Sequence, residues 1–300
     1  MSARDVTRMG EGARGAALLL VLWLIALLTA VVGAFALTAR TEQLQGRVLA
    51  RGLAAEGAAR AGIEYALTRV NASDPRRQWQ PDGRPHPWRF GDAVVEVALV
   101  DENGKVDLNQ ADVALLTALF VRIEVEPQAA ARLASAILDW RDTDTLTQPA
   151  GGGEDADYAS AGRIYGAKDA DFESVAELEQ VLGITPALYA RVQPHVTVYS
   201  GRQRPDPAFA SAQVLDAMGL QGNDLVAQRR QWNPESGQPA PGLPTGESLV
   251  GSQSGTYSID SRARLGDGRE AVLRVVVRTG GAGPGMAYTP LRWEEGASPR

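Results

Sequence analysis

The chain has 300 residues, of which 44% are hydrophobic, with a formal net charge of -6 and no cysteine. This length and hydrophobic fraction suffice for about two domains with real cores. The slight acidic excess and the lack of a basic run argue against nucleic acid as the main partner. The absence of cysteine excludes disulfide bonds as a source of stability.

A stretch without charged residues begins after Arg14 and ends before Arg40. As a helix that rises ~1.5 Å per residue it reaches ~37 Å, which exceeds the ~30 Å hydrocarbon core of a bilayer. A cleaved signal peptide would have a shorter apolar region of about 7 to 15 residues. We therefore predict a transmembrane helix over residues 16–39.

The charges before this stretch predict how the helix is oriented. Arg4, Arg8 and Arg14 outnumber Asp5 and Glu11. Because positive charges favour the cytoplasmic side of a membrane, we expect a single-pass protein with a cytoplasmic N-terminus. The bulk of the chain then lies on the opposite side.

The helical pattern continues beyond the membrane segment. From Leu44 to Val70 small and apolar residues recur at spacings of three and four, and charged residues occupy the other faces. We predict one continuous helix over residues 16–70, roughly 80 Å long at the standard rise. Such a rod can pack with copies of itself.

The rest of the chain alternates between extended and helical patterns. Four prolines between residues 71 and 90 oppose regular structure, so this segment is predicted to be a linker or wrapped loop. Residues 233–255 are predicted to form a long mobile loop, and the tail after residue 280 is expected to fray. We predict helices at 111–121, 127–140, 175–182, 186–192 and 205–218, and strands at 93–100, 195–199, 255–265 and 270–278.

An acidic segment carries the candidate metal site. Carboxylates at this density beside the flexible run Gly151–Gly153 suit calcium, which takes six to eight oxygen ligands. Zinc is disfavoured because no cysteine or histidine lies in the segment. The spacing does not fit an EF-hand, so a solvated surface loop remains the alternative. The candidate ligands are Asp139, Asp142, Asp144, Glu154, Asp155 and Asp157.

Other motifs give weaker signals. Residues 177–192 resemble a helix-hairpin-helix, a module that often binds DNA phosphates, but their charge is not basic, which favours a structural hairpin. His86 and His195 have no catalytic or metal partner nearby in sequence. No nucleophile elbow or phosphate-binding loop is present, so we do not expect an enzyme.

The N-terminal pattern resembles the prepilin-type segment of type IV pilins and type II secretion pseudopilins: a basic leader that ends in Gly15, an apolar run and a long helix. The resemblance implies cleavage by a prepilin peptidase between Gly15 and Ala16, with methylation of Ala16. Most such subunits carry a glutamate at the fifth mature position, which is Leu20 here. A carboxylate in hydrocarbon costs about 2.5–3.5 kcal/mol unless it is paired, so Leu20 suits a tip subunit that lacks the pairing neighbour.

Four segments further along resemble, in order, the signatures of the pseudopilin K family: residues 106–109, 137–144, 153–158 and 174–183. The resemblance implies a minor pseudopilin in the bacterial inner membrane, with its bulk in the periplasm. It also implies a calcium site in the acidic segment. The expected partners are pseudopilins I and J at the filament tip and the major pseudopilin.

The same resemblance sets the expected architecture. We predict an α+β fold with a long N-terminal transmembrane, pilin-like helix, an antiparallel sheet domain and an inserted all-helical domain. The expected divisions are a leader (1–15), the long helix (16–70), a linker with the first part of the sheet domain (71–108), the helical insert (109–193), the rest of the sheet domain (194–280) and a flexible tail (281–300).

The long helix is also our candidate for contacts at the tip of the filament. Its small-residue stripe and the position of Leu20 suggest the surface that meets neighbouring helices. Two alternative functions remain, a minor pilin of a type IV pilus and a membrane-anchored DNA-binding protein that uses the hairpin. The candidate tip contacts are Leu20, Leu44, Val48, Ala55, Ala59 and Ile63.

Overall fold

The structure is a computed structural model that describes residues 12–74, 76–233, 236–280 and 287–296. Its internal contacts divide the chain into two compact units, Met1–Ala55 and Glu56–Arg300. Most of the predicted leader (1–15) and part of the predicted tail (281–300) lie outside the described residues. Cleavage after Gly15 and methylation of Ala16 therefore stay predictions.

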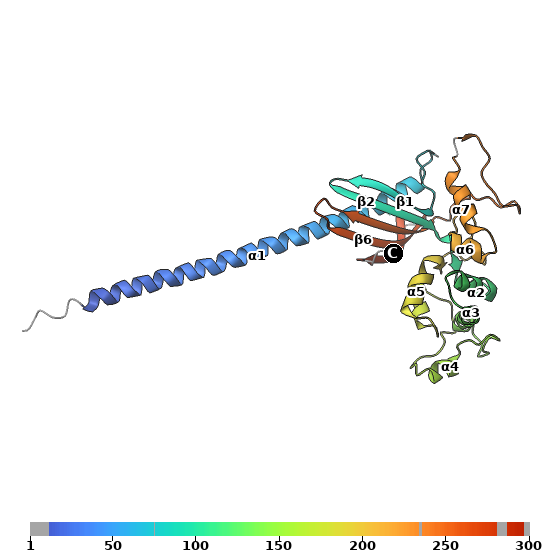
Figure 1. Ribbon diagram of the computed structural model, residues 1–300, viewed down its shortest axis with the longest axis horizontal. Coiled ribbons are helices and arrows are strands. Elements are labelled where there is room, and N and C mark those ends of the chain that lie inside the picture. The colour runs from blue at the N-terminus through green and yellow to red at the C-terminus, as the bar shows by residue number, and fades with distance from the viewer. Residues whose placement is uncertain (1–11, 75, 234–235, 281–286, 297–300) are drawn as a thin grey trace, which may run out of the picture. The chain divides into compact units, whose positions relative to one another are not determined.

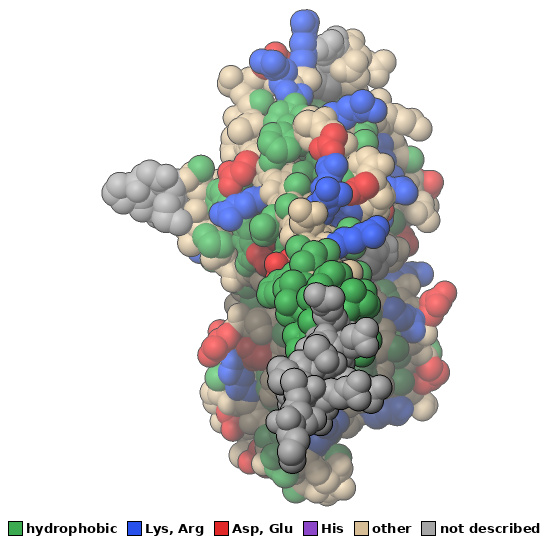
Figure 2. Space-filling view, turned by 90° about the vertical axis from the view of Figure 1, so that its left-hand side faces the viewer, with side chains coloured by type: hydrophobic (Ala, Val, Ile, Leu, Met, Phe, Trp, Pro, Cys, Tyr) green, Lys and Arg blue, Asp and Glu red, His purple; other side chains and the backbone are tan. Residues whose placement is uncertain are grey.

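Helix α1 (Gly12–Val70) confirms the predicted long helix. Its part from Ala16 onward is long and apolar enough to cross a membrane, with a mean hydropathy of 2.8 in its most apolar window. Figure 2, in which the N-terminal end of this helix faces the viewer, shows hydrophobic side chains gathered there. Thr29 and Thr38 donate their hydroxyl protons to backbone carbonyls one turn earlier, so these polar groups are satisfied within the helix.

In the second unit the described residues form a five-stranded antiparallel sheet in the order β1-β2-β5-β6-β7 (Figure 1). The predicted strands at 93–100, 255–265 and 270–278 are confirmed as its three central strands. The strands are β1 (Asp82–Phe90), β2 (Ala93–Asp101), β5 (Thr256–Arg264), β6 (Glu270–Thr279) and β7 (Tyr288–Glu295).

The last turns of α1 pack on one face of this sheet. Alternate residues of β2 are fully buried there, among them Val95 and Val97. The hydroxyl of Ser261 in β5 donates to the carbonyl of Ala59 at 2.7 Å. A Cβ added to Gly62 would lie 2.5 Å from that hydroxyl oxygen, so the helix approaches the sheet this closely only because residue 62 has no side chain.

The two edge strands were not predicted. β1 lies in the segment that we expected to be a linker, although it contains Pro85 and Pro87. An edge strand tolerates proline because only one of its sides needs ladder hydrogen bonds. β7 lies in the expected fraying tail, where the guanidinium of Arg60 in α1 sits 5.4 Å from the ring centre of Trp293.

The remaining helices gather on one side of the sheet (Figure 1), and most of them share a hydrophobic core. The predicted helices at 111–121, 127–140 and 186–192 are confirmed, whereas the one at 175–182 is a 3₁₀ helix. The helices are η1 (Glu102–Gly104), α2 (Val113–Arg122), α3 (Pro127–Arg141), α4 (Asp155–Ser160), η2 (Val175–Gln180), α5 (Pro186–Val192), η3 (Gln193–His195), α6 (Ala212–Ala217) and α7 (Gly222–Gln231).

The shared core extends past residue 193, where we expected the helical insert to end. Val214 and Leu215 of α6 belong to it, and Val226 of α7 packs against it. α6 is shorter than the helix predicted at 205–218, and α7 was not predicted. The strand expected at 195–199 is reduced to β4 (Val196–Thr197), which pairs in parallel with β3 (Val106–Asp107).

Part of the segment predicted to be a mobile loop (233–255) is packed. Leu243 and Leu249 are buried, and a single bridge pairs Gly242 with Ser248. These contacts fold residues 242–249 into a compact turn.

Candidate metal centre

Three carboxylates converge in the acidic segment. One oxygen from each of Asp142, Asp144 and Glu154 lies within 4.8 Å of the others. Glu154 is only 7% exposed, whereas Asp144 is exposed and Asp142 is half-buried. The three side chains can therefore meet a single cation that approaches from the exposed side.

Two ordered elements hold these carboxylates. Asp142 caps the C-terminus of α3, where its backbone N–H donates to the carbonyl of Leu138 at 2.9 Å. Glu154 is the N-cap residue of the short helix α4. Between them, the Asp144 carboxylate accepts a hydrogen bond from the N–H of Leu146 at 2.8 Å. The site thus joins the end of one helix to the beginning of another.

The electrostatics of the cluster disfavour three free carboxylates. Burial, together with the charges of Asp139, Asp142 and Asp169, raises the pKa of Glu154 to about 7. Burial and the charge of Asp144 also raise the pKa of Asp142. In the part of the chain that the structure describes, Oε1 of Glu154 and Oδ1 of Asp142 are buried without a hydrogen-bond partner. A bound cation would relieve both the repulsion and these unsatisfied oxygens.

The other three predicted ligands do not join this cluster. Each carboxylate accepts a backbone N–H instead: Asp139 from Gly153 at 2.8 Å, Asp155 from Ala167 at 3.1 Å, and Asp157 from Glu154 at 3.1 Å. These hydrogen bonds shape the loop, and the structure does not bring the three residues into the cluster, so their role as ligands stays a prediction. A Cβ added to Gly152 would lie 1.6 Å from the Asp139 carboxylate, so this glycine is required by close approach.

Asp169 is an acidic neighbour that the sequence analysis missed. Its charge contributes to the raised pKa values of both Glu154 and Asp142. Its backbone N–H donates to the carbonyl of Trp140, the residue two positions before Asp142. Asp169 has a positive φ of 55°, a backbone feature that can be seen only in the structure.

The residues present fit a hard cation such as calcium. Calcium takes carboxylate, carbonyl and water oxygens in adaptable geometry, and three clustered carboxylates with an acidic neighbour offer such a set. No cysteine is available, and no histidine belongs to the cluster. The donor set therefore disfavours zinc.

The candidate tip contacts on α1 fall into two groups. Leu20, Leu44 and Val48 are exposed, at 67%, 55% and 54% of their surface. Ala55, Ala59 and Ile63 are fully buried within this chain. The prediction was wrong for these three residues, because a side chain with no exposed surface cannot meet a partner.

The predicted hairpin and the two histidines make contacts within the folded chain. Val181, Ile184 and Leu188 pack into the helical core. His86 stacks on Trp79 with ring centres 4.0 Å apart, and burial lowers its pKa to about 4. His195 contacts the hydroxyl of Ser211 at 3.1 Å.

Comparison with known proteins identifies relatives of this chain. Residues 97–201 match the family model described as Type II secretion system (T2SS), protein K. The Type II secretion system protein K of Aeromonas hydrophila is 30% identical over 179 residues, which are 54% of each chain. The protein of the same name from Klebsiella pneumoniae is 28% identical over 212 residues, 63% of each chain. The chain thus spans between half and two thirds of the length of these relatives.

A solved structure shares the fold. The match is to the crystal structure of the GspK-GspI-GspJ complex from the enterotoxigenic Escherichia coli Type 2 Secretion System, with a TM-score of 0.56 and 18% identity. It covers 87% of this chain and 99% of that chain. The predicted α+β class, with a long helix, an antiparallel sheet and additional helices, is confirmed.

Proposed function

Because residues 97–201 place this chain in the type II secretion system protein K family, we propose that it is a minor pseudopilin at the tip of a secretion pseudopilus. In this role it helps to start and to limit assembly of the filament that exports folded proteins across the outer membrane. The family match over these residues carries the proposal and favours it over a type IV pilus subunit. The role is structural and includes no catalytic step.

The long helix supports an anchored subunit. Its charge-free first half can sit in the inner membrane with the N-terminus in the cytoplasm, where a prepilin peptidase would cut after Gly15. Leu20 places no carboxylate in the hydrocarbon, so a subunit at the filament's end needs no further neighbour to neutralise one. The bulk of the chain would then lie in the periplasm.

Partners follow from the relative of known structure. That crystal structure holds GspK together with GspI and GspJ, and we propose that this chain binds the corresponding pseudopilins I and J. The exposed face of α1 that contains Leu44 and Val48 is the candidate contact surface. Apolar side chains that are more than half exposed beyond a membrane segment are suited to packing against a neighbouring helix.

A pair of helix variants tests this contact. Replacing both Leu44 and Val48 with glutamate should reduce copurification with pseudopilins I and J from detergent-solubilised membranes by at least about tenfold, because it buries two charges against apolar partner helices. Leu53→Glu is the control, since Leu53 is 69% exposed and lies about 180° around the helix from Leu44. Copurification of the double variant at the parental level would contradict the proposed surface.

We also propose that Asp142, Asp144 and Glu154 bind calcium and thereby fix the acidic loop against the helical core. Backbone carbonyls and water would complete the coordination. A cation there would hold the end of α3 to the start of α4. The clustered carboxylates and the two unsatisfied buried oxygens support this proposal.

Calorimetric titration of the full-length protein in detergent tests the site. We expect Glu154→Gln to weaken calcium binding at least tenfold, because it removes the most buried of the three charges. Asp155→Asn removes the same charge from a residue outside the cluster and keeps an oxygen for the N–H of Ala167, so it should bind as the parent does. At a hundredfold excess over Kd, calcium should add about 2.7 kcal/mol to the free energy of unfolding. Absence of binding at millimolar calcium, or equal loss in both variants, would refute the assignment.

A further inference from the structure

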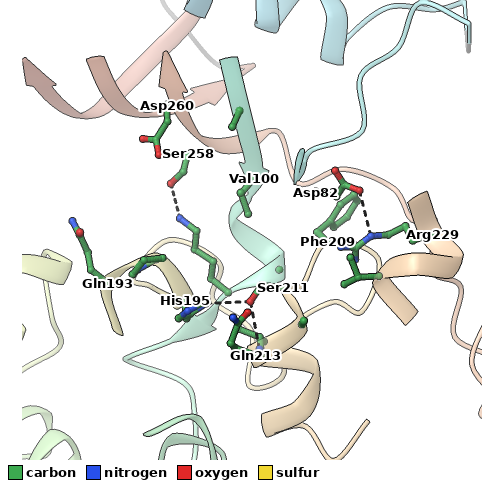
Figure 3. Close-up of a pocket in the computed structure, with 18 of the residues that line it drawn as sticks. Asp82, Val100, Gln193, His195, Phe209, Ser211, Gln213, Arg229, Ser258 and Asp260 are labelled. Atoms are coloured by element: carbon green, nitrogen blue, oxygen red, sulfur yellow. Dashed lines mark hydrogen bonds and ion pairs between the residues drawn. The ribbon is translucent and has the colours of Figure 1, made fainter. Parts of the chain in front are cut away.

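A cavity of about 420 Å³ lies between the sheet and the helices η3, α6 and α7 (Figure 3). On the sheet side it is lined by Ala98, Val100 and Val276. Val100 alternates with the buried Leu99 of β2, so it lies on the face turned away from α1. On the helical side Phe209, Val214 and Val226 complete an apolar lining. This site is separate from the acidic loop and from the exposed face of α1.

Among the charged side chains that line the cavity, cations outnumber carboxylates. Its acidic members are Asp82 and Asp260. Two further carboxylates just outside the lining, Glu102 and Glu294, pair with its cations. Its cationic members are Lys105, Arg229, Arg230, Arg274 and Arg292.

Most of these cations are held in place by the protein itself. Lys105 donates to Glu102 at 2.7 Å and to Ser258 at 2.6 Å. Arg229 is 4% exposed, donates to the carbonyls of Pro207 and Ala210, and approaches Asp82 at 3.5 Å. These ion pairs therefore form a fixed polar wall whose ordering costs little further entropy when a ligand binds.

Arg230 differs from its neighbours. It is exposed at the end of α7 and makes no ion pair with any residue in the ranges that the structure covers. It follows the buried Arg229 directly in sequence, so its backbone position is fixed by an anchored residue. Its guanidinium is free to form the paired hydrogen bonds that match a carboxylate.

We propose that this cavity binds a carboxylate attached to a short aliphatic body, with the carboxylate on Arg230 and the aliphatic part between Val100, Val226 and Val276. Binding sites for small ligands combine apolar walls with a few fixed polar groups in a volume of this size. An inorganic anion would leave the apolar walls unused. Such a ligand is available as a free short-chain organic acid or as the C-terminal residue of a peptide.

The test uses N-acetyl-leucine as the probe and N-acetyl-leucinamide, which lacks the carboxylate, as its neutral match. In calorimetric titration of the full-length protein in detergent, the acid should bind at least tenfold more tightly than the amide. Arg230→Gln should remove about tenfold of the affinity for the acid, the scale of one charge-assisted hydrogen bond. The control is Arg264→Gln, which changes an exposed arginine on the same sheet but outside the cavity. This variant should bind the acid with unchanged affinity.

A second variant tests the apolar walls independently of charge. Ala98→Phe places an aromatic ring in the cavity and should abolish binding of the acid, while circular dichroism confirms that the protein remains folded. A tripeptide that ends in leucine, compared with its C-terminal amide, separates the two sources. If the tripeptide binds more tightly than N-acetyl-leucine, the ligand is the C-terminus of a peptide. If it binds more weakly, the ligand is a free organic acid. Equal binding of acid and amide, no binding of either, or equal loss in the Arg230 and Arg264 variants would overturn the proposal.

Discussion

Replacing Gly62 with valine should lower the free energy of unfolding of the Glu56–Arg300 unit by about 3 kcal/mol, the upper end of overpacking costs in protein cores. An added Cβ would lie 2.5 Å from the Ser261 hydroxyl oxygen and 2.7 Å from Cγ1 of Val95. Neither can retreat easily, because Ser261 is hydrogen-bonded to Ala59 and Val95 is fully buried. The helix would have to lift from the sheet, which exposes the core along its length.

A second glycine in the same helix provides the control. A Cβ added to Gly57 would meet nothing within 4 Å, so Gly57→Ala should gain up to about 1 kcal/mol from helix propensity alone. Chemical denaturation of the full-length protein in detergent, followed by circular dichroism, measures both changes. If Gly62→Val were as stable as the parent protein, the close packing of α1 on β2 and β5 would be wrong.

The sequence predicts the parts of this fold whose patterns repeat. The uncharged run between Arg14 and Arg40 and the small-residue stripe after it predict α1. Strand-forming segments bounded by turn residues predict β2, β5 and β6. The edge strands escape because their patterns are interrupted: Pro85 and Pro87 break the signal of β1, and Pro290 that of β7. A strand tolerates proline where one of its sides makes no ladder hydrogen bonds. Whether a strand lies at the edge depends on the whole sheet and not on the segment alone.

The candidate site shows a similar division. Composition identifies the acidic segment, but it cannot tell which carboxylates bind backbone N–H groups and which remain for a ligand. The carboxylates of Asp139 and Asp157 accept hydrogen bonds from backbone N–H groups of the loop, whereas Glu154 is buried with one oxygen that has no hydrogen-bond partner. Asp169 is brought near only by the turn after α4. Likewise, the spacing of Ala59 and Ile63 on the helix indicates a packing face but not whether its partner is this chain or another.

Glu102 should be the most sensitive charged residue between the sheet and the helical block. It is 2% exposed, and its carboxylate accepts hydrogen bonds from Lys105, from Thr197 in β4 and from Ser258 in β5. Glu102→Leu removes the partner of Lys105, whose side chain is only 10% exposed. Loss of one member of a buried ion pair costs about 3–5 kcal/mol, because the other charge stays buried without compensation.

The matched double variant separates the ion pair from the fold around it. Glu102→Leu combined with Lys105→Met removes both charges and should recover most of the lost stability, since apolar replacement of a buried pair is often neutral. Thr197 and Ser258 still lose an acceptor, so we expect about 1–2 kcal/mol to remain. Denaturant titration of the parent, both single variants and the double variant completes the cycle. A single variant that costs under 1 kcal/mol, or a double variant as unstable as Glu102→Leu alone, would show that this carboxylate does not hold the helical block to the sheet through Lys105.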